Sequence, residues 1–359
     1  MTRDREDRLR AAIRPVVEKA AADGFSGVLG VAHQGSMVFE NAYGRASRRW
    51  SIDNTAATRF RVASVSKVFT AATVLRLARD GAVDIEAPLL PYVDHVHPSL
   101  DARVTVRHAL TMTSGIADWF EEDSADWEAE WARLTAEHPL YLLRGNADYV
   151  PLFAGRPAHF APGERYKYNG AGYILLGVMI EKATGLAFAE AVARHVFGPA
   201  GMRHSGFAAL NEAEPGLAEG YLTAADSATA LRTNLYSTTP CGAADGGATC
   251  TSSDLLAFAR ALRSGRLLGD EDTRLALTPQ IAEREEKVRG YRWMYGFGLT
   301  FLLGDDGEVV RWGHTGEEDG VSARLYHYPA EDVDIAILGN VSWSAGDLGW
   351  ALHEVVLDA

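Results

Sequence analysis

Hydrophobic positions near the start of the chain follow two periodicities. Residues 5–22 carry apolar side chains three and four positions apart, which predicts an amphipathic helix. The apolar runs SGVLGVAHQ and MVFENAYG come next and flank a turn at Gly35 and Ser36. Apolar runs on either side of a glycine turn are typical of a β-hairpin.

The other end of the chain has the same character. Four strand-like runs (FGLTFLLG, EVVRWGHTG, VSARLYHYP and DVDIAILGNV) are separated by turn residues, and a helical pattern, AGDLGWALHEVVL, follows them. Between the two ends, AGYILLGVMIEKATG and AFAEAVARHVFGPAGM are helical and end at glycines. We therefore expect an α+β protein with an antiparallel sheet flanked by helices and an inserted, mostly helical domain.

The predicted domains follow from this order of elements. Residues 1–85 and 246–359 would form a discontinuous sheet domain, residues 86–245 the helical domain, and the active site would lie in the cleft between them. The sequence has no internal repeat and no low-complexity linker that would separate independent units.

Composition narrows the possible partners. The 359 residues are 47% hydrophobic, which suits a large core, and the formal net charge of -13 argues against nucleic acid or an anionic membrane as a partner. No apolar run reaches the roughly 18 residues of a spanning helix, and the N-terminus is charged where a secretory signal is apolar. We expect a cytoplasmic protein.

The two cysteines, Cys241 and Cys250, are expected to be reduced thiols, with a local disulfide as the alternative.

The stretch RVASVSKVFTAATVLRLARDG contains the first candidate for catalysis. On a helix, residues three positions apart share a face, so the hydroxyl of Ser64 and the amine of Lys67 would be neighbours. A nearby amine can activate a serine nucleophile, and the helix dipole is expected to lower the pKa of Lys67. The alternative is a capped helix with a partly buried lysine.

Further motifs follow Ser64 in a fixed order: VRHALTMTSGI, PGERYKYNGAGYILLG, GGATCTSSDLLAFARAL and WGHTG. With these motifs the chain resembles the class C β-lactamase-like serine hydrolases over nearly its full length. That family includes β-lactamases, D-alanyl-D-alanine carboxypeptidases, D-aminopeptidases, esterases and acyltransferases. The resemblance implies a DD-peptidase/β-lactamase-like fold with no cofactor and no metal.

The resemblance also assigns roles to residues. Ser64 matches the acylated nucleophile, Lys67 its proton-accepting partner, and Tyr168 the tyrosine of the Tyr-x-Asn element, which relays protons. His314 and Gly316 match the third motif, in which the lactamases usually have Lys-Thr-Gly. The backbone N–H of Glu317, with that of Ser64, would then form the oxyanion hole.

Two departures from the family pattern bear on the substrate. Gly170 stands where the family has an asparagine that binds the substrate amide, and Asn169 would replace it only if the backbone turned differently. His314 replaces a permanent cation, and Glu317, Glu318 and Asp319 follow it, so we expect carboxylate-bearing substrates to bind poorly. The alternative is that these three acids point into solvent.

Two other sequence features have competing explanations. Residues 117–160 are rich in aromatic side chains and would roof the cleft, but Trp127 and Trp131 have the spacing of a helical packing stripe. Residues 94–97, DHVH, lack companion ligands for a metal site.

The favoured function is a serine hydrolase that forms an acyl-enzyme on small esters or amides, with esterase first and weak β-lactamase activity as a side reaction. The alternatives are an acyltransferase, a D-aminopeptidase, carboxypeptidase or β-lactamase, and a ligand-binding relative without turnover.

Overall fold

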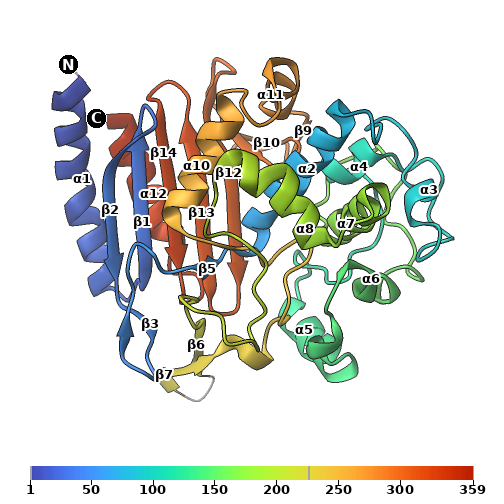
Figure 1. The fold of residues 1–359 in the computed structure, drawn as a ribbon, viewed down its shortest axis with the longest axis horizontal. Coiled ribbons are helices and arrows are strands. Elements are labelled where there is room, and N and C mark those ends of the chain that lie inside the picture. The colour runs from blue at the N-terminus through green and yellow to red at the C-terminus, as the bar shows by residue number, and fades with distance from the viewer. Residues whose placement is uncertain (1, 225–226, 359) are drawn as a thin grey trace.

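A computed structural model of the protein describes residues 2–224 and 227–358. In this part of the chain the main sheet has eight strands in the order β2-β1-β14-β13-β12-β11-β10-β9, and every neighbouring pair is antiparallel (Figure 1). The strands are β1 (Gly27–His33), β2 (Ser36–Tyr43), β9 (Ile281–Ala282), β10 (Arg292–Tyr295), β11 (Thr300–Leu303), β12 (Val309–Glu318), β13 (Val321–Tyr328) and β14 (Val333–Gly339). The predicted hairpin and the four predicted C-terminal strands are therefore confirmed.

The two terminal helices cover one face of the sheet. Helix α1 (Thr2–Ala22) contacts α12 (Gly346–Asp358), and their apolar faces share a core with β1, β13 and β14. This core includes Leu9, Ile13, Leu29, Ile335 and Leu352, all buried. Ends far apart in sequence thus form one layer, as the apolar patterns at both ends predicted.

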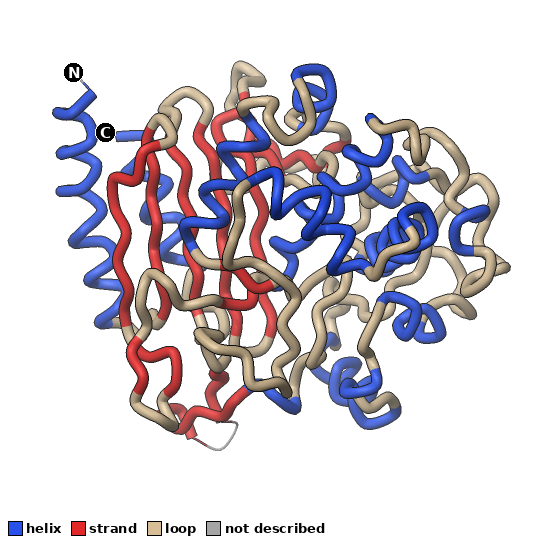
Figure 2. Tube along the Cα trace, viewed as in Figure 1, coloured by secondary structure: helices blue, strands red, loops and turns tan. Residues whose placement is uncertain are grey.

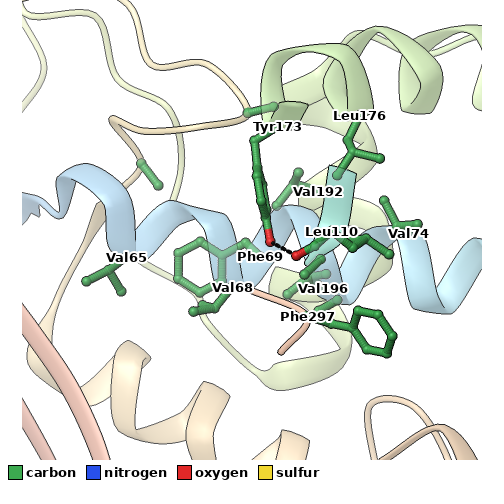
Figure 3. Packing of buried hydrophobic residues seen from close by; sticks show 14 of the residues in the cluster. Val65, Val68, Phe69, Val74, Leu110, Tyr173, Leu176, Val192, Val196 and Phe297 are labelled. Atoms are coloured by element: carbon green, nitrogen blue, oxygen red, sulfur yellow. Dashed lines mark hydrogen bonds between the residues drawn. The ribbon is translucent and has the colours of Figure 1, made fainter. Parts of the chain in front are cut away.

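The opposite face packs against α10 (Ser252–Arg263) and against the 3₁₀ turn Ala63–Ser66, which leads into α2 (Lys67–Arg79). Helix α2 is buried along most of its length, and Phe69 packs edge to face against Phe197 and Phe258, with ring centroids 5.1 and 5.0 Å away. Figure 3 shows Val65, Val68 and Phe69 in this core, where the Tyr173 hydroxyl donates to the Leu110 carbonyl at 2.9 Å. A rigid core therefore holds the helix that carries Lys67.

The middle of the chain is mostly helical and lies to one side of the sheet (Figure 2). Its helices are α3 (Leu90–Val93), α4 (Val106–Leu110), α5 (Trp127–Glu137), α6 (Asn146–Tyr149), α7 (Gly170–Thr184), α8 (Phe188–Val192) and α9 (Gly198–Ala200), with a π-helical turn at Ala193–Phe197. Short 3₁₀ turns are Leu140–Leu142, Val150–Leu152 and Asn234–Tyr236, and α11 (Asp270–Ala276) follows later. The α+β fold class is confirmed.

Three small strand pairs complete the fold: β3 (Arg45–Ser47) with β4 (Ile52–Asp53), β5 (Phe60–Arg61) with β8 (Thr249–Cys250), and β6 (Tyr221–Ala224) with β7 (Ser227–Thr233). The β6–β7 hairpin falls within residues 86–245, yet Tyr221 bridges to Val341 beside the main sheet. The division into two domains at residues 85 and 245 stays a prediction. No helix of the described residues is long and apolar enough to cross a bilayer.

Candidate active site

Ser64 and Lys67 meet where a short 3₁₀ turn, Ala63–Ser66, leads into α2. The Lys67 Nζ donates a hydrogen bond to the Ser64 Oγ at 2.9 Å, as the spacing of the two residues predicted. Ala63 has a φ of 44°, a left-handed conformation that an alanine adopts at a cost of about 1 kcal/mol or more. Strain directly before Ser64 shows that the surrounding structure fixes the position of this turn.

The turn and α2 bind the backbone of residues 244–248. Ser66 Oγ accepts from the Ala248 N–H at 2.9 Å, and Lys67 Nζ donates to the Asp245 carbonyl at 2.6 Å. Thr70 donates to the Ala244 carbonyl at 2.6 Å. One helical face, formed by positions 66, 67 and 70, therefore fixes this loop beside Ser64.

Tyr168 completes the group around Ser64. Its hydroxyl is within hydrogen-bonding reach of both Ser64 and Lys67, and the Lys67 Nζ lies 4.9 Å from the centre of its ring. Burial raises the pKa of Tyr168 to about 12, although the neighbouring Lys67 ammonium opposes this shift. Tyr168 is thus a neutral phenol at pH 7, next to a cation that favours its ionised form.

The predicted lowering of the Lys67 pKa is wrong. Burial by itself would lower it, but the acidic groups of Tyr168 and Asp245 outweigh burial and hold the pKa above its ordinary value. The helix dipole, on which the predicted shift rested, is outweighed by acidic groups from segments distant in sequence. Lys67 is therefore an ammonium in the resting protein.

Strand β12 runs directly against the residues before Ser64. A Cβ on Gly316 would lie 2.1 Å from the Val62 carbonyl oxygen, so only glycine permits this approach. The residue after Gly316 is Glu317, whose backbone is thereby brought next to the 3₁₀ turn that carries Ser64. This packing is consistent with the predicted oxyanion hole.

His314 lies on β12 and is 2% exposed. Its Nδ1 is 2.6 Å from the Thr315 carbonyl, which makes Nδ1 the protonated nitrogen, and its Nε2 faces the Tyr295 hydroxyl at 3.4 Å. Burial lowers its pKa to about 3, so the ring is neutral at pH 7. The His314 ring also lies 6.3 Å from that of Tyr168, so His314 is placed to support Tyr168 but carries no charge.

Asn169 and Gly170 begin helix α7. The Asn169 Oδ1 accepts from the Gly172 N–H at 2.6 Å as an N-cap, and its Nδ2 donates to the Ile116 carbonyl at 3.1 Å. Asn169 is 3% exposed and uses its amide within the fold. A substrate-binding role for it stays a prediction, and this capping geometry gives it no support.

The space beside Gly170 is filled by Trp119, from the aromatic segment expected to roof the cleft, and by Asp118 and Asp245, which the sequence did not indicate. A Cβ on Gly170 would lie 2.9 Å from both the Asp245 Oδ2 and the Trp119 Nε1, which are hydrogen-bonded to each other at 2.9 Å. Asp118 accepts from the backbone N–H of Gly170 at 2.6 Å, and burial raises its pKa to about 7. Short acidic segments such as ADWFEED resemble solvated loops, so only the missing side chain at Gly170 pointed to this space.

The acids after Gly316 do not behave as predicted. Glu317 pairs with Arg324 at 2.6 Å, and Glu318 pairs with Arg61 at 2.8 Å. Both side chains are thus neutralised inside the protein and neither points freely into solvent. The predicted contribution of Glu317 and Glu318 to a negative cleft edge is therefore wrong, because Arg324 on the neighbouring strand β13 and Arg61 on the distant strand β5 pair with them.

The aromatic segment divides into two groups. Trp119 packs against Tyr149 and Trp131, with ring centroids 5.1 and 6.2 Å away, so it is both a packing residue and a wall beside Gly170. Trp127 is 42% exposed.

The described residues contain no group of three or more His, Cys, Asp or Glu that could hold a metal ion, and both cysteines are free thiols.

Comparisons with known proteins agree with this fold. The sequence profile of the family described as Beta-lactamase matches residues 9–351. A penicillin-binding protein structure from Bacillus halodurans is 32% identical, covers 96% of this chain and 99% of its own, and superposes with a TM-score of 0.86.

Related proteins differ in the activities that their names describe. Penicillin-binding protein 4* of Bacillus subtilis is 27% identical over 85% of this chain, and Esterase EstB of Burkholderia gladioli is 34% identical over 49%. A D-aminopeptidase of Brucella anthropi is 24% identical over 97%. The chain spans 65%, 45% and 62% of the lengths of these three proteins. Family members are thus serine hydrolases with different substrates, and the chain belongs to the beta-lactamase family.

Proposed function

We propose that the protein is a serine hydrolase that forms an acyl-enzyme on Ser64, with esters as its favoured substrates. The observation that carries this proposal is the 2.9 Å hydrogen bond from Lys67 Nζ to Ser64 Oγ, with the Tyr168 hydroxyl in reach of both groups. Nucleophile and proton-transfer groups within hydrogen-bonding distance are the geometric signature of nucleophilic catalysis.

The proposed proton transfers follow from the charges of these groups. The Lys67 ammonium orients the Ser64 hydroxyl and lowers the cost of ionising Tyr168, whose phenol proton passes to solvent. The resulting phenolate takes the Ser64 proton as Oγ attacks the acyl carbon. Tyr168 then returns that proton to the leaving alcohol or amine. In deacylation the same phenolate takes a proton from water as the water oxygen attacks the ester carbon on Ser64. Tyr168 then returns that proton to the departing Ser64 Oγ, which restores the serine hydroxyl as the acid is released.

The backbone N–H groups of Ser64 and Glu317 are the proposed donors to the developing oxyanion. The close approach of Gly316 to Val62 supports this assignment, since it brings the two backbone segments together. The proposed cleft lies between this edge of the sheet and the helical part of the chain that carries Tyr168.

Esters are favoured over β-lactams and peptides for two reasons. Gly170 offers no amide side chain to the substrate, and the neutral His314 offers no cation to a substrate carboxylate. Partial similarity to Esterase EstB agrees with this choice. D-aminopeptidase activity is the second candidate, because the Asp245 carboxyl group near Lys67 suits a substrate with a free amine and a D-aminopeptidase aligns with 97% of the chain.

The test compares the wild type with Ser64→Ala on p-nitrophenyl acetate and butyrate, nitrocefin and a D-alanyl p-nitroanilide, with protein mass followed in parallel. We expect ester turnover that Ser64→Ala abolishes, with little action on nitrocefin. Rapid nitrocefin turnover would reject the preference for esters, and a stable adduct without turnover would favour a non-hydrolytic relative. Product that forms only with an added alcohol or amine would indicate acyl transfer.

The pH dependence tests the role of Tyr168. Because its pKa is about 12, the phenolate fraction grows about tenfold per pH unit below that value, and kcat/KM for esters should rise toward alkaline pH. Tyr168→Phe should lose this rise and most of the activity. A profile that is flat from pH 7 to 10 would argue against Tyr168 as the base.

A further inference from the structure

The space beside Gly170 contains a hydrogen bond that the proposed proton transfers do not use. The Trp119 indole N–H donates to the Asp245 Oδ2 at 2.9 Å, and a methyl group on Gly170 would lie 2.9 Å from both atoms. The bond fits there only because position 170 is glycine. The hydrogen bond between Trp119 and Asp245 therefore depends on the missing side chain at Gly170, and the three residues pack together in the wall of the site.

Asp245 connects this unit to the catalytic lysine. Its carbonyl accepts the Lys67 Nζ at 2.6 Å, while its carboxylate accepts the Trp119 N–H. Asp245 sits in a tight turn closed by the hydrogen bond from Ala243 N to the Gly246 carbonyl at 2.8 Å. A glycine follows Asp245 directly and leaves the backbone free to rotate, so an anchor on the side chain restricts where the carbonyl points.

Trp119 is itself held firmly. Its backbone N–H donates to Asp118 Oδ1 at 2.7 Å, and the Asp118 carboxylate also caps the start of α7 through the Gly170 N–H. Its ring packs against Tyr149 and Trp131. The indole N–H is thus fixed relative to α7, the helix directly after Tyr168.

We propose that Trp119 is a positioning residue for acylation: through the Asp245 carboxylate it sets the Asp245 carbonyl that holds the Lys67 ammonium against Ser64. This inference rests on the proposed function of Ser64. It explains why glycine replaces the asparagine of the family pattern, because the indole and carboxylate occupy the space of that side chain. The lysine contact is then supplied by a backbone carbonyl.

The experiment compares Trp119→Phe, Asp245→Ala, Asp245→Asn and the double variant W119F/D245A with the wild type. Reactivity is measured as the rate of fluorophosphonate labelling of Ser64 and as kcat and KM for p-nitrophenyl butyrate. Asp245→Asn removes a charge near Lys67 as well, so the rates of the variants are compared at several pH values across the whole profile. Trp131→Phe is the matched control, since it changes the same aromatic cluster but leaves the Trp119–Asp245 bond intact.

We expect Trp119→Phe and Asp245→Ala each to lower the labelling rate and kcat on the order of 10-fold with KM unchanged, the loss that a small misplacement of a catalytic group causes. The double variant should lose no more than either single variant, because all three break one connection. Asp245→Asn should stay within about threefold of the wild type, since its amide oxygen still accepts the indole N–H.

Three results would overturn the proposal. The first is a Trp119→Phe variant that is as active as Trp131→Phe. The second is a double variant whose loss equals the product of the two single losses. The third is an Asp245→Asn variant that is as slow as Asp245→Ala while Trp119→Phe keeps the wild-type rate. The last pattern would mean that Asp245 acts through its charge. Should Trp119→Phe fail to fold, Gly170→Ala breaks the same bond from the other side and should show the same loss.

Failure of this inference is distinguishable from failure of the proposed function. A wild type that is neither labelled at Ser64 nor active on any ester rejects the proposed function itself. A labelled, active wild type with unaffected Trp119 and Asp245 variants rejects the positioning role alone.

Discussion

The close approach of β12 to the turn before Ser64 predicts a strong effect of Gly316→Ala. The new Cβ would lie 2.1 Å from the Val62 carbonyl oxygen, whereas carbon–oxygen contacts are ordinarily about 3.3 Å, so the strand must move by about 1.2 Å. A shift of about 1 Å in a catalytic group can cost about 100-fold, and one lost oxyanion donor costs about 100- to 1000-fold. We therefore expect kcat/KM for p-nitrophenyl butyrate to fall by about 100-fold or more, equivalent to about 2.7 kcal/mol.

The matched control for this variant is Gly206→Ala. The nearest atom to a Cβ on Gly206 is an Arg59 guanidinium nitrogen at 3.8 Å, an ordinary contact. Both variants are compared at equal concentrations of folded protein, checked by circular dichroism. If folded Gly316→Ala stayed within about threefold of Gly206→Ala, the backbone of Glu317 would have no part in stabilising the oxyanion.

Three further predictions concern residues around the site. His314 has a pKa of about 3 in the fold against 6.5 when unfolded, so the free energy of unfolding should fall by up to about 1.4 kcal/mol per pH unit below pH 6.5. In urea unfolding, His314→Gln should lack this fall, and an equal pH dependence of the two proteins would contradict the assignment. Arg61→Met leaves the largely buried Glu318 unpaired and should cost about 3–5 kcal/mol in urea unfolding, while a cost below about 1 kcal/mol would mean that the pair is well solvated. Asn169→Ala removes the cap on Gly172 and should cost about 1–2 kcal/mol without changing KM for esters; a raised KM would instead return Asn169 to substrate binding.

Local sequence patterns predicted the features that depend on neighbouring residues. The Ser64–Lys67 contact follows from helical spacing, and the C-terminal strands follow from short apolar runs between turn residues. Spacing and apolar runs do not show which strand lies beside the turn that carries Ser64, and only the family resemblance indicated that Glu317 would lie there. The closeness of Gly316 to Val62 is a property of the folded sheet.

The errors arose where partners come from distant segments. Trp119 and Asp245 are 126 positions apart, and no periodicity connects them. Arg61 and Glu318 are likewise far apart, so a run of acids appeared unpaired although each of the first two has an arginine partner. The direction of the Lys67 pKa shift was wrong for the same reason, since distant acidic groups decide it.

Burial of the catalytic charges separates two effects of ionic strength. Lys67 is 1% exposed and Asp245 is 8% exposed, so dissolved ions cannot come between them, whereas the formal net charge of -13 belongs mainly to the solvated surface. Added salt should therefore leave kcat nearly constant, yet slow the encounter with cationic substrates and speed it with anionic ones. Ionic strength therefore affects the rate at which substrate reaches the site and has little effect on the rate of the chemical steps within it.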